Sequence, residues 1–144
     1  MITIIFLSFF LVACVTMMHF EGLTFTARYA LRHSNLGRWH LILTIMLIMA
    51  LHLSEICVFS VGIYFAHHVL HLGAFSGDRE FALIDYFHFS AETFVTVGYG
   101  DLYPIGPLRI LTGIESLTGV LLIAWSGAFS FFTVQRLWEN QIKK

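Results

Sequence analysis

Long apolar runs dominate the chain and predict membrane-spanning helices. Three runs are long enough, at residues 2–20, 39–66 and 108–137. A helix needs about 20 mostly apolar residues to cross the hydrocarbon core of a bilayer. The second and third runs exceed that length, so we expect tilted helices or protruding ends. The pattern predicts an all-α, multi-pass membrane protein.

Composition agrees with this interpretation and narrows the partners. Of the 144 residues, 58% are hydrophobic and 12% are charged, whereas soluble domains are about half apolar and a quarter charged. The net charge of −1 gives no basic excess, so we expect membrane lipids and no nucleic acid as partners. Cys14 and Cys57 both fall inside apolar runs, which argues against a disulfide framework.

The first run has an alternative interpretation as a cleaved signal peptide, because "LVAC" at 11–14 looks like a cleavage box. A signal peptide needs a positively charged segment before its apolar run, and no lysine or arginine precedes residue 2. The run also stays apolar beyond Cys14. We therefore expect residues 1–20 to be a retained transmembrane helix.

Positive charges predict the orientation in the membrane. They gather in the two segments that hold Arg28, Arg32, Arg38 and Arg136, Lys143, Lys144. Lysine and arginine favour the cytoplasmic side. We therefore expect the N-terminus outside, and both the 21–38 segment and the short 139–144 tail in the cytoplasm of a plasma-membrane protein. The 21–38 segment is either an amphipathic helix on the inner surface or a solvated connector.

The predicted outer segment, 67–107, is not an ordinary loop. Residues 83–95 lie in the aromatic stretch "FALIDYFHFSAETF" and predict a helix of about 20 Å, too short to cross the membrane and return. Irregular backbone at membrane depth is tolerated only inside protein or beside a water-filled cavity. A short re-entrant helix followed by "TVGYGD" at 96–101 is therefore typical of a pore loop.

The motif "TVGYG" looks like the selectivity filter of potassium channels, and Asp101 matches the acid that follows it. The longer stretch "ETFVTVGYGDLYP", 92–104, resembles the pore of bacterial two-helix potassium channels. The resemblance covers residues 39–138, as an outer helix 39–66, a pore helix 83–95, a filter 96–101 and an inner helix 108–137. The N-terminal helix lies outside that pattern.

The residue types of the filter suit K⁺ chemistry. A potassium ion loses its hydration shell only where oxygens replace the water, and backbone carbonyls from four copies of the loop supply them. Gly98 and Gly100 allow the required backbone angles, since glycine reaches positive φ at little cost. The resemblance places K⁺ at Thr96, Val97, Gly98 and Tyr99. We expect the Thr96 hydroxyl to add a ligand layer, while Val97 and Tyr99 pack behind the loop.

The resemblance also implies support behind the filter. Glu92 and Asp101 match a carboxyl–carboxylate pair, in which one acid keeps its proton because two adjacent acids do not both ionise cheaply. The alternative is that Asp101 is a solvated charge at the outer mouth. His88 and Phe89 replace the family's tryptophans, which makes His88 the expected donor to Asp101.

The predicted inner helix carries a candidate hinge and gate. Gly119 aligns with the family's hinge glycine if one residue is missing after Pro104; alternatively, its small size lets helices approach closely. From Gly119, steps of four along one helix face select Ile123, Gly127 and Phe131 as the pore lining. We expect Phe131 to form the gate.

Further polar residues lie in or near the apolar runs. His52, Glu55 and Glu115 lie at similar predicted depths and are candidates for a polar cluster; each also has a local hydrogen-bonding alternative, and Glu115 an alternative facing the cavity. His67, His68 and His71 either sense pH or bind a metal, or lie at the interface as polar ends. Negative charge at the outer mouth attracts cations, and its sources are Asp78, Glu80, Asp85 and Asp101.

These expectations combine into a potassium-selective channel that conducts K⁺ passively. One filter per chain implies a homotetramer. We expect no enzyme activity and no cofactor besides the permeant ion. The alternative is a non-conducting subunit that assembles with other channel proteins and regulates them.

Overall fold

The computed structural model describes residues 1–32, 38–76 and 82–142. The elements follow in the order α1 (Ile2–Arg32), α2 (Arg38–His68), β1 (Ala74–Ser76), α3 (Leu83–Phe94), β2 (Tyr103–Ile105) and α4 (Leu108–Ile142). Three helical segments are long and apolar enough to cross a membrane: Ile2–Tyr29, Leu41–His68 and Leu108–Arg136. The chain is therefore a multi-pass, mostly helical membrane protein.

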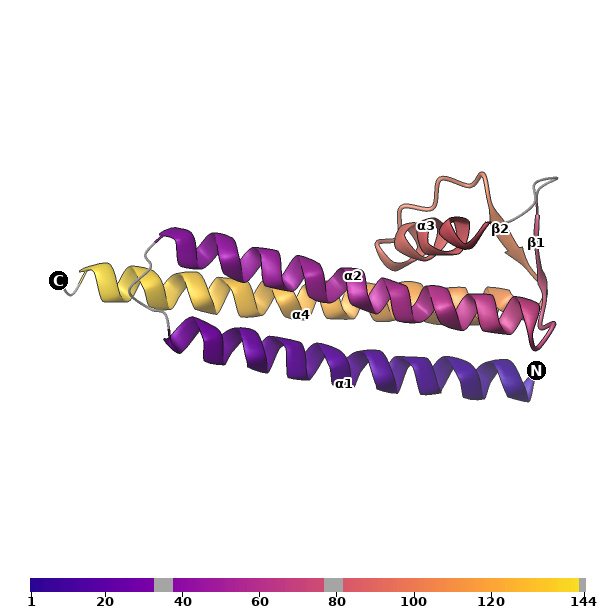
Figure 1. Ribbon diagram of the computed structural model, residues 1–144, viewed down its shortest axis with the longest axis horizontal. Helices are drawn as coiled ribbons and strands as arrows, with labels where there is room; N and C mark the ends of the chain where they lie inside the picture. The colour runs from indigo at the N-terminus through magenta and orange to yellow at the C-terminus, as the bar shows by residue number, and fades with distance from the viewer. Residues whose placement is uncertain (33–37, 77–81, 143–144) are drawn as a thin grey trace.

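The three long helices lie side by side, and the short helix α3 covers one end of the bundle (Figure 1). The chain runs along α2 in the direction opposite to α1 and α4. Helix α1 packs against α2 and α4, and α3 contacts the same two helices from the other side (Figure 1). The N-terminus lies at the end of the bundle that carries α3, and the C-terminus lies at the opposite end.

Helix α1 extends well beyond its predicted end at residue 20. One buried stripe continues through the whole helix: Ile4, Ser8, Leu11, Val15, His19, Leu23 and Thr26. Steps of three and four residues keep one helix face against its neighbours, so 21–32 is part of the same helix. The two alternatives for 21–38, a surface helix and a solvated connector, are both wrong as far as Arg32; residues 33–37 lie outside the described residues.

The other predicted helix ends differ less. Helix α2 ends at His68 rather than 66, α3 ends at Phe94 rather than 95, and α4 continues to Ile142, past the predicted end at 137. The tail expected at 139–144 is thus helical as far as it is described.

Glycines bring α1 and α2 close together. A Cβ atom added at Gly22 would lie 2.6 Å from Cδ1 of Leu51, and one at Gly62 would lie 2.4 Å from Cδ1 of Leu11. Each helix thus offers a glycine to a leucine of the other. Small residues at such contacts let membrane helices gain van der Waals contact without a hydrophobic driving force.

A two-stranded antiparallel sheet joins the two ends of the segment that holds α3. Phe75 of β1 pairs with Pro104 of β2. Gly73 has a φ of +137°, and a Cβ there would lie 2.4 Å from the carbonyl oxygen of Ile105. The strands, which the sequence pattern did not predict, fix the point at which the chain enters and leaves the loop.

Gly119 allows α4 to pass directly beneath the end of α3. A Cβ at Gly119 would lie 2.1 Å from the carbonyl oxygen of Phe94, and α4 is one continuous helix through this point. Of the two interpretations of Gly119, the structure shows the close approach; a hinge role is a proposal that the static helix does not test.

We predict that Gly119→Ala destabilises the protein. Alanine is normally the better helix former by about 1 kcal/mol, but here its methyl group meets backbone, and overpacking costs about 1–3 kcal/mol. Gly127→Ala is the matched control, because an added Cβ there meets nothing within 4 Å in the described chain. Thermal unfolding of the purified protein in detergent measures both; equal stability of the two variants would contradict the prediction.

Candidate functional site

The loop after α3 has an unusual backbone. Positive φ angles occur at Thr96 (60°), Gly98 (53°) and Gly100 (82°), and Val97 and Tyr99 between them are not among the positive-φ residues. Positive and negative φ angles therefore alternate from 96 to 100, a pattern that we call alternating hand. Such alternation lets successive carbonyl groups turn toward one side, and rings of backbone carbonyls are what line a cation filter.

Thr96 is the costly member of this series. A non-glycine residue in the left-handed region is strained by about 1–3 kcal/mol, and such strain gathers at functional sites. Local hydrogen bonds hold it: Thr96 N–H donates to the Thr93 carbonyl at 3.1 Å, and Val97 N–H donates to the Glu92 carbonyl at 2.9 Å. The end of α3 therefore imposes the start of the loop conformation.

The loop is open on one side. Val97 is 53% exposed and Tyr99 73% exposed, so the structure does not show them packed behind the loop. A cleft of about 640 Å³ separates the loop from the start of α4, and Thr96, Gly113 and Ser116 are among its lining residues. Ser116 Oγ donates to the Thr93 carbonyl at 2.8 Å, which ties the base of the loop to α4.

Glu92 supports the loop from behind, but with partners other than the predicted one. Its Oε2 accepts from the Tyr99 N–H at 3.3 Å. Its Oε1 lies 2.7 Å from His88 Nδ1, an ion-pair distance without hydrogen-bond geometry. The His88 ring also stacks on Tyr99, with centroids 6.3 Å apart.

Asp101 is exposed and is not among the partners found for Glu92 in the described chain. The predicted Glu92–Asp101 pair and the His88–Asp101 contact are therefore absent from this subunit, because the loop turns the Tyr99 N–H toward Glu92 instead. Asp101 instead fits the alternative, a charge at the mouth of the loop.

Glu115 belongs to a junction of three elements and not to the cluster predicted for it. Ser90 of α3 lies 2.5 Å from Glu115 Oε1 and 3.0 Å from the Ile56 carbonyl of α2. Both side chains are fully buried, so Glu115 does not face an open cavity. A serine hydroxyl has a single proton. Ser90 therefore satisfies both contacts only if it donates that proton to the Ile56 carbonyl. Glu115 must then be protonated and donate to the Ser90 oxygen.

Histidines at the end of α2 anchor α3. The buried Tyr86 hydroxyl lies 2.6 Å from His67 Nδ1 and 2.9 Å from His68 Nε2. Burial raises the pKa of the Tyr86 hydroxyl, so it keeps its proton as a donor. His71 is exposed in the following turn.

Of the predicted outer acids, Asp85 is involved in the start of α3. Its carboxylate accepts from the Ala82 N–H at 2.9 Å, next to the first turn of the helix. Asp78 and Glu80 lie outside the described residues.

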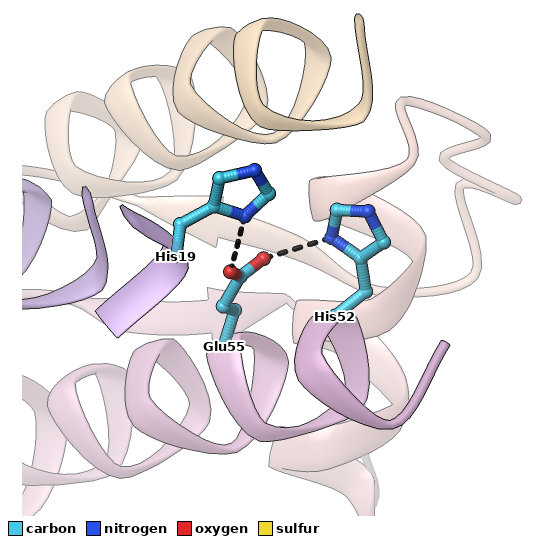
Figure 2. A group of neighbouring side chains, drawn as sticks. All are labelled: His19, His52 and Glu55. Carbon is cyan, nitrogen blue, oxygen red and sulfur yellow. Dashed lines mark hydrogen bonds and ion pairs between the residues drawn. The ribbon is translucent and has the colours of Figure 1, made fainter. Parts of the chain in front are cut away.

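A second polar site lies among the long helices (Figure 2). Glu55 of α2 accepts on Oε1 from His19 Nδ1 of α1 at 2.7 Å, and its Oε2 lies 2.8 Å from His52 Nδ1. The predicted cluster thus contains His52 and Glu55, but its third member is His19 and not Glu115. The sequence signal for His19 was its position as a polar ring in an otherwise apolar span.

Two of the proposed lining residues of α4 are exposed. Ile123 is 40% exposed and Phe131 64% exposed. Trp125 is 42% exposed and lies beside α1, with its ring 5.2 Å from that of His19. The assignment of Ile123, Gly127 and Phe131 to a pore remains a proposal.

A short helix that ends in a loop of alternating hand, framed by two long apolar helices, defines a pore-loop membrane protein. Comparison with known families agrees: the family described as "Ion channel" matches residues 41–134, and the chain belongs to it.

One curated relative is the inward rectifier potassium channel Kirbac3.1 of Paramagnetospirillum magnetotacticum, which is 47% identical over 47 residues. The match covers 32% of this chain and 16% of the relative, so the chain matches only a small part of that protein's length. No solved structure gives a significant match.

We predict that Glu115→Gln leaves stability within about 1 kcal/mol of the wild type, whereas Glu115→Asp costs about 1–3 kcal/mol. The glutamine side chain still reaches Ser90 and is a neutral donor. The aspartate side chain is shorter, so its carboxyl group no longer reaches Ser90 and is left buried without that partner. Unfolding in detergent measures the order. A glutamine variant less stable than the aspartate variant would show that an ionised carboxylate is required at 115.

Proposed function

We propose that the protein is a potassium-selective channel that conducts K⁺ passively as a homotetramer. The observation that carries this proposal is the alternating hand of residues 96–100 within the sequence TVGYG. Four such loops around one axis would offer rings of carbonyl oxygens in place of the hydration shell of K⁺. The K⁺ sites would then lie at Thr96, Val97, Gly98 and Tyr99.

The helix behind the loop supports a cation site. Helix α3 ends at Phe94, immediately before the loop, and the C-terminal end of a helix carries about half a negative charge. Ser116 fixes this end against α4, so the negative end of the dipole would face the space beneath the loop. That field favours a cation that has just left, or is about to enter, the filter.

The subunit surface supports the tetramer. Val97 and Tyr99 stand exposed on the loop, beside a cleft along α4. A fourfold ring would cover them with neighbouring subunits and close the pore by symmetry. The relative named as a potassium channel points to the same ion.

The arrangement of the ends supports the orientation. The N-terminus and the pore loop lie at one end of the bundle (Figure 1). Arg32, Arg38 and Arg136 lie in the helix ends toward the other, and positive residues favour the cytoplasmic side. We place the pore loop and the N-terminus outside the plasma membrane, and the C-terminus in the cytoplasm.

Selective K⁺ flux is the first test. Purified protein alone in liposomes should pass K⁺ far better than Na⁺, and Ba²⁺ should block, since it has a similar size and twice the charge. Gly98→Ala should abolish flux while the tetramer still forms, because a Cβ opposes the φ of +53° at that position. Equal K⁺ and Na⁺ permeability would exclude the selective filter. An absence of any flux from assembled wild-type protein would favour the regulatory subunit.

The pore lining gives a second test. In a background without Cys14 and Cys57, cysteines at 123, 127 and 131 should react quickly with a thiol reagent added from the cytoplasmic side. Cysteines at 121 and 125 should react slowly, because that side of α4 meets α1 or lipid. Phe131→Ser should raise basal flux, since a ring of phenylalanines stops ions by dewetting. Equal reaction rates at all five positions would reject this face as the lining.

A further inference from the structure

We propose that His19, His52 and Glu55 form a binding site for a divalent transition metal ion of the Zn²⁺ class, which fastens α1 to α2 inside the membrane. One candidate ligand atom from each of the three side chains lies within 4.8 Å of the others. Figure 2 shows the Glu55 carboxylate between the two imidazole rings. Two imidazole nitrogens and one carboxylate oxygen are a donor set that Zn²⁺ takes in proteins, with the fourth position left for water.

The helices bring these ligands together. His52 and Glu55 are three residues apart on α2 and therefore share one face. His19 comes from α1, which runs antiparallel to α2 (Figure 1). It belongs to the buried stripe that runs along α1. A site divided between two rigid helices has fixed ligand directions, and an ion in it would join them.

The two nitrogen–oxygen distances lie close to those of a metal site. The two Nδ1–carboxylate distances are 2.7 and 2.8 Å, which fit a proton in each gap. Ligands about 2.0–2.1 Å from a tetrahedral zinc ion stand roughly 3.3 Å from one another. The carboxylate would therefore move away from the rings by a few tenths of an ångström, while the two rings would turn toward each other.

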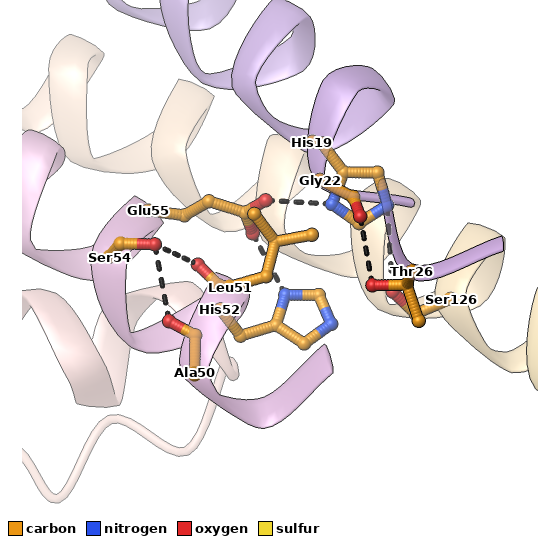
Figure 3. Close-up of polar contacts among 9 residues, drawn as sticks. All are labelled: His19, Gly22, Thr26, Ala50, Leu51, His52, Ser54, Glu55 and Ser126. Atoms are coloured by element: carbon orange, nitrogen blue, oxygen red, sulfur yellow. Dashed lines mark hydrogen bonds and ion pairs between the residues drawn. The ribbon is translucent and has the colours of Figure 1, made fainter. Parts of the chain in front are cut away.

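A partner on α4 suits the metal-bound form of His19. His19 Nε2 faces Ser126 Oγ at 3.5 Å, as Figure 3 shows. When Nδ1 binds a metal, the proton of a neutral imidazole lies on Nε2, and such rings almost always donate it to an oxygen. Ser126 is placed to accept it, so all three long helices take part in the site.

Charge and access also fit an ion. Glu55 and His19 are fully buried, and a buried carboxylate at membrane depth is costly unless positive charge compensates it. A divalent ion supplies that charge. The His52 side chain retains 14% of its surface exposed, so the site is not fully enclosed.

Metal binding to the full-length protein in detergent tests the proposal. Co²⁺ should give the intense visible absorption of four-coordinate cobalt, with one ion per subunit, and Zn²⁺ should displace it and raise Tm. Glu55→Gln and His52→Gln should abolish the spectrum. Glu21→Gln is the matched control: this carboxylate is exposed on α1, two residues from His19, and its loss should change nothing.

Ser126→Ala separates binding from folding. It removes no ligand, so the protein should fold and still bind, but the affinity should fall by about tenfold or more.

Three results would overturn the proposal: no cobalt spectrum in the wild type, a spectrum that survives in both Glu55→Gln and His52→Gln, or a Tm that depends on pH through Glu55 without any response to metal. The last would assign the site to a proton. None of these readouts depends on K⁺ flux.

Discussion

Irregular backbone can lie at membrane depth only where protein or an enclosed water cavity surrounds it, and the architecture of this chain follows from that constraint. The 95–102 segment is neither helix nor strand, so its polar groups need partners that lipid cannot give. Glu92 takes one N–H of the loop, and Ser116 binds the last turn before it. Both contacts depend on the glycine at position 119, because α4 must approach the Phe94 carbonyl closely.

Three polar junctions hold the pore helix and the long helices in register. Tyr86 meets His67 and His68 near one end of α2. Ser90 joins the Ile56 carbonyl, about three turns further along α2, to Glu115. Beside Ile56, Glu55 turns to the opposite side and meets α1. Apolar contacts against lipid discriminate poorly between helix positions, because lipid tails are as apolar as leucine. Directed polar contacts at fixed depths therefore set which residues face one another.

The sequence predicted the spans, the short helix and the loop because each of these depends on local pattern. Apolar length identifies a span, and TVGYG requires glycine where φ is positive, as found at Gly98 and Gly100. Pairing across helices was harder to predict. Glu115 was placed with His52 from depth alone, but depth does not tell which face of a helix a residue occupies relative to a second helix. The rotation of α4 that sends Glu115 to Ser90 is set by the contact between Gly119 and Phe94.

The same limit explains the misjudged end of α1. A hydropathy pattern stops at Glu21, yet the buried face continues through Leu23 and Thr26, because α2 provides a surface for it as far as Leu51 opposite Gly22. Helix α1, which lies outside the two-helix pore pattern, is thus packed against both α2 and α4. Through His19 it contacts Glu55 of α2 and approaches Ser126 of α4, next to Trp125 and on the same helix as the proposed pore lining. Helix α1 therefore contacts α4 at Trp125 and Ser126, on the C-terminal side of Gly119.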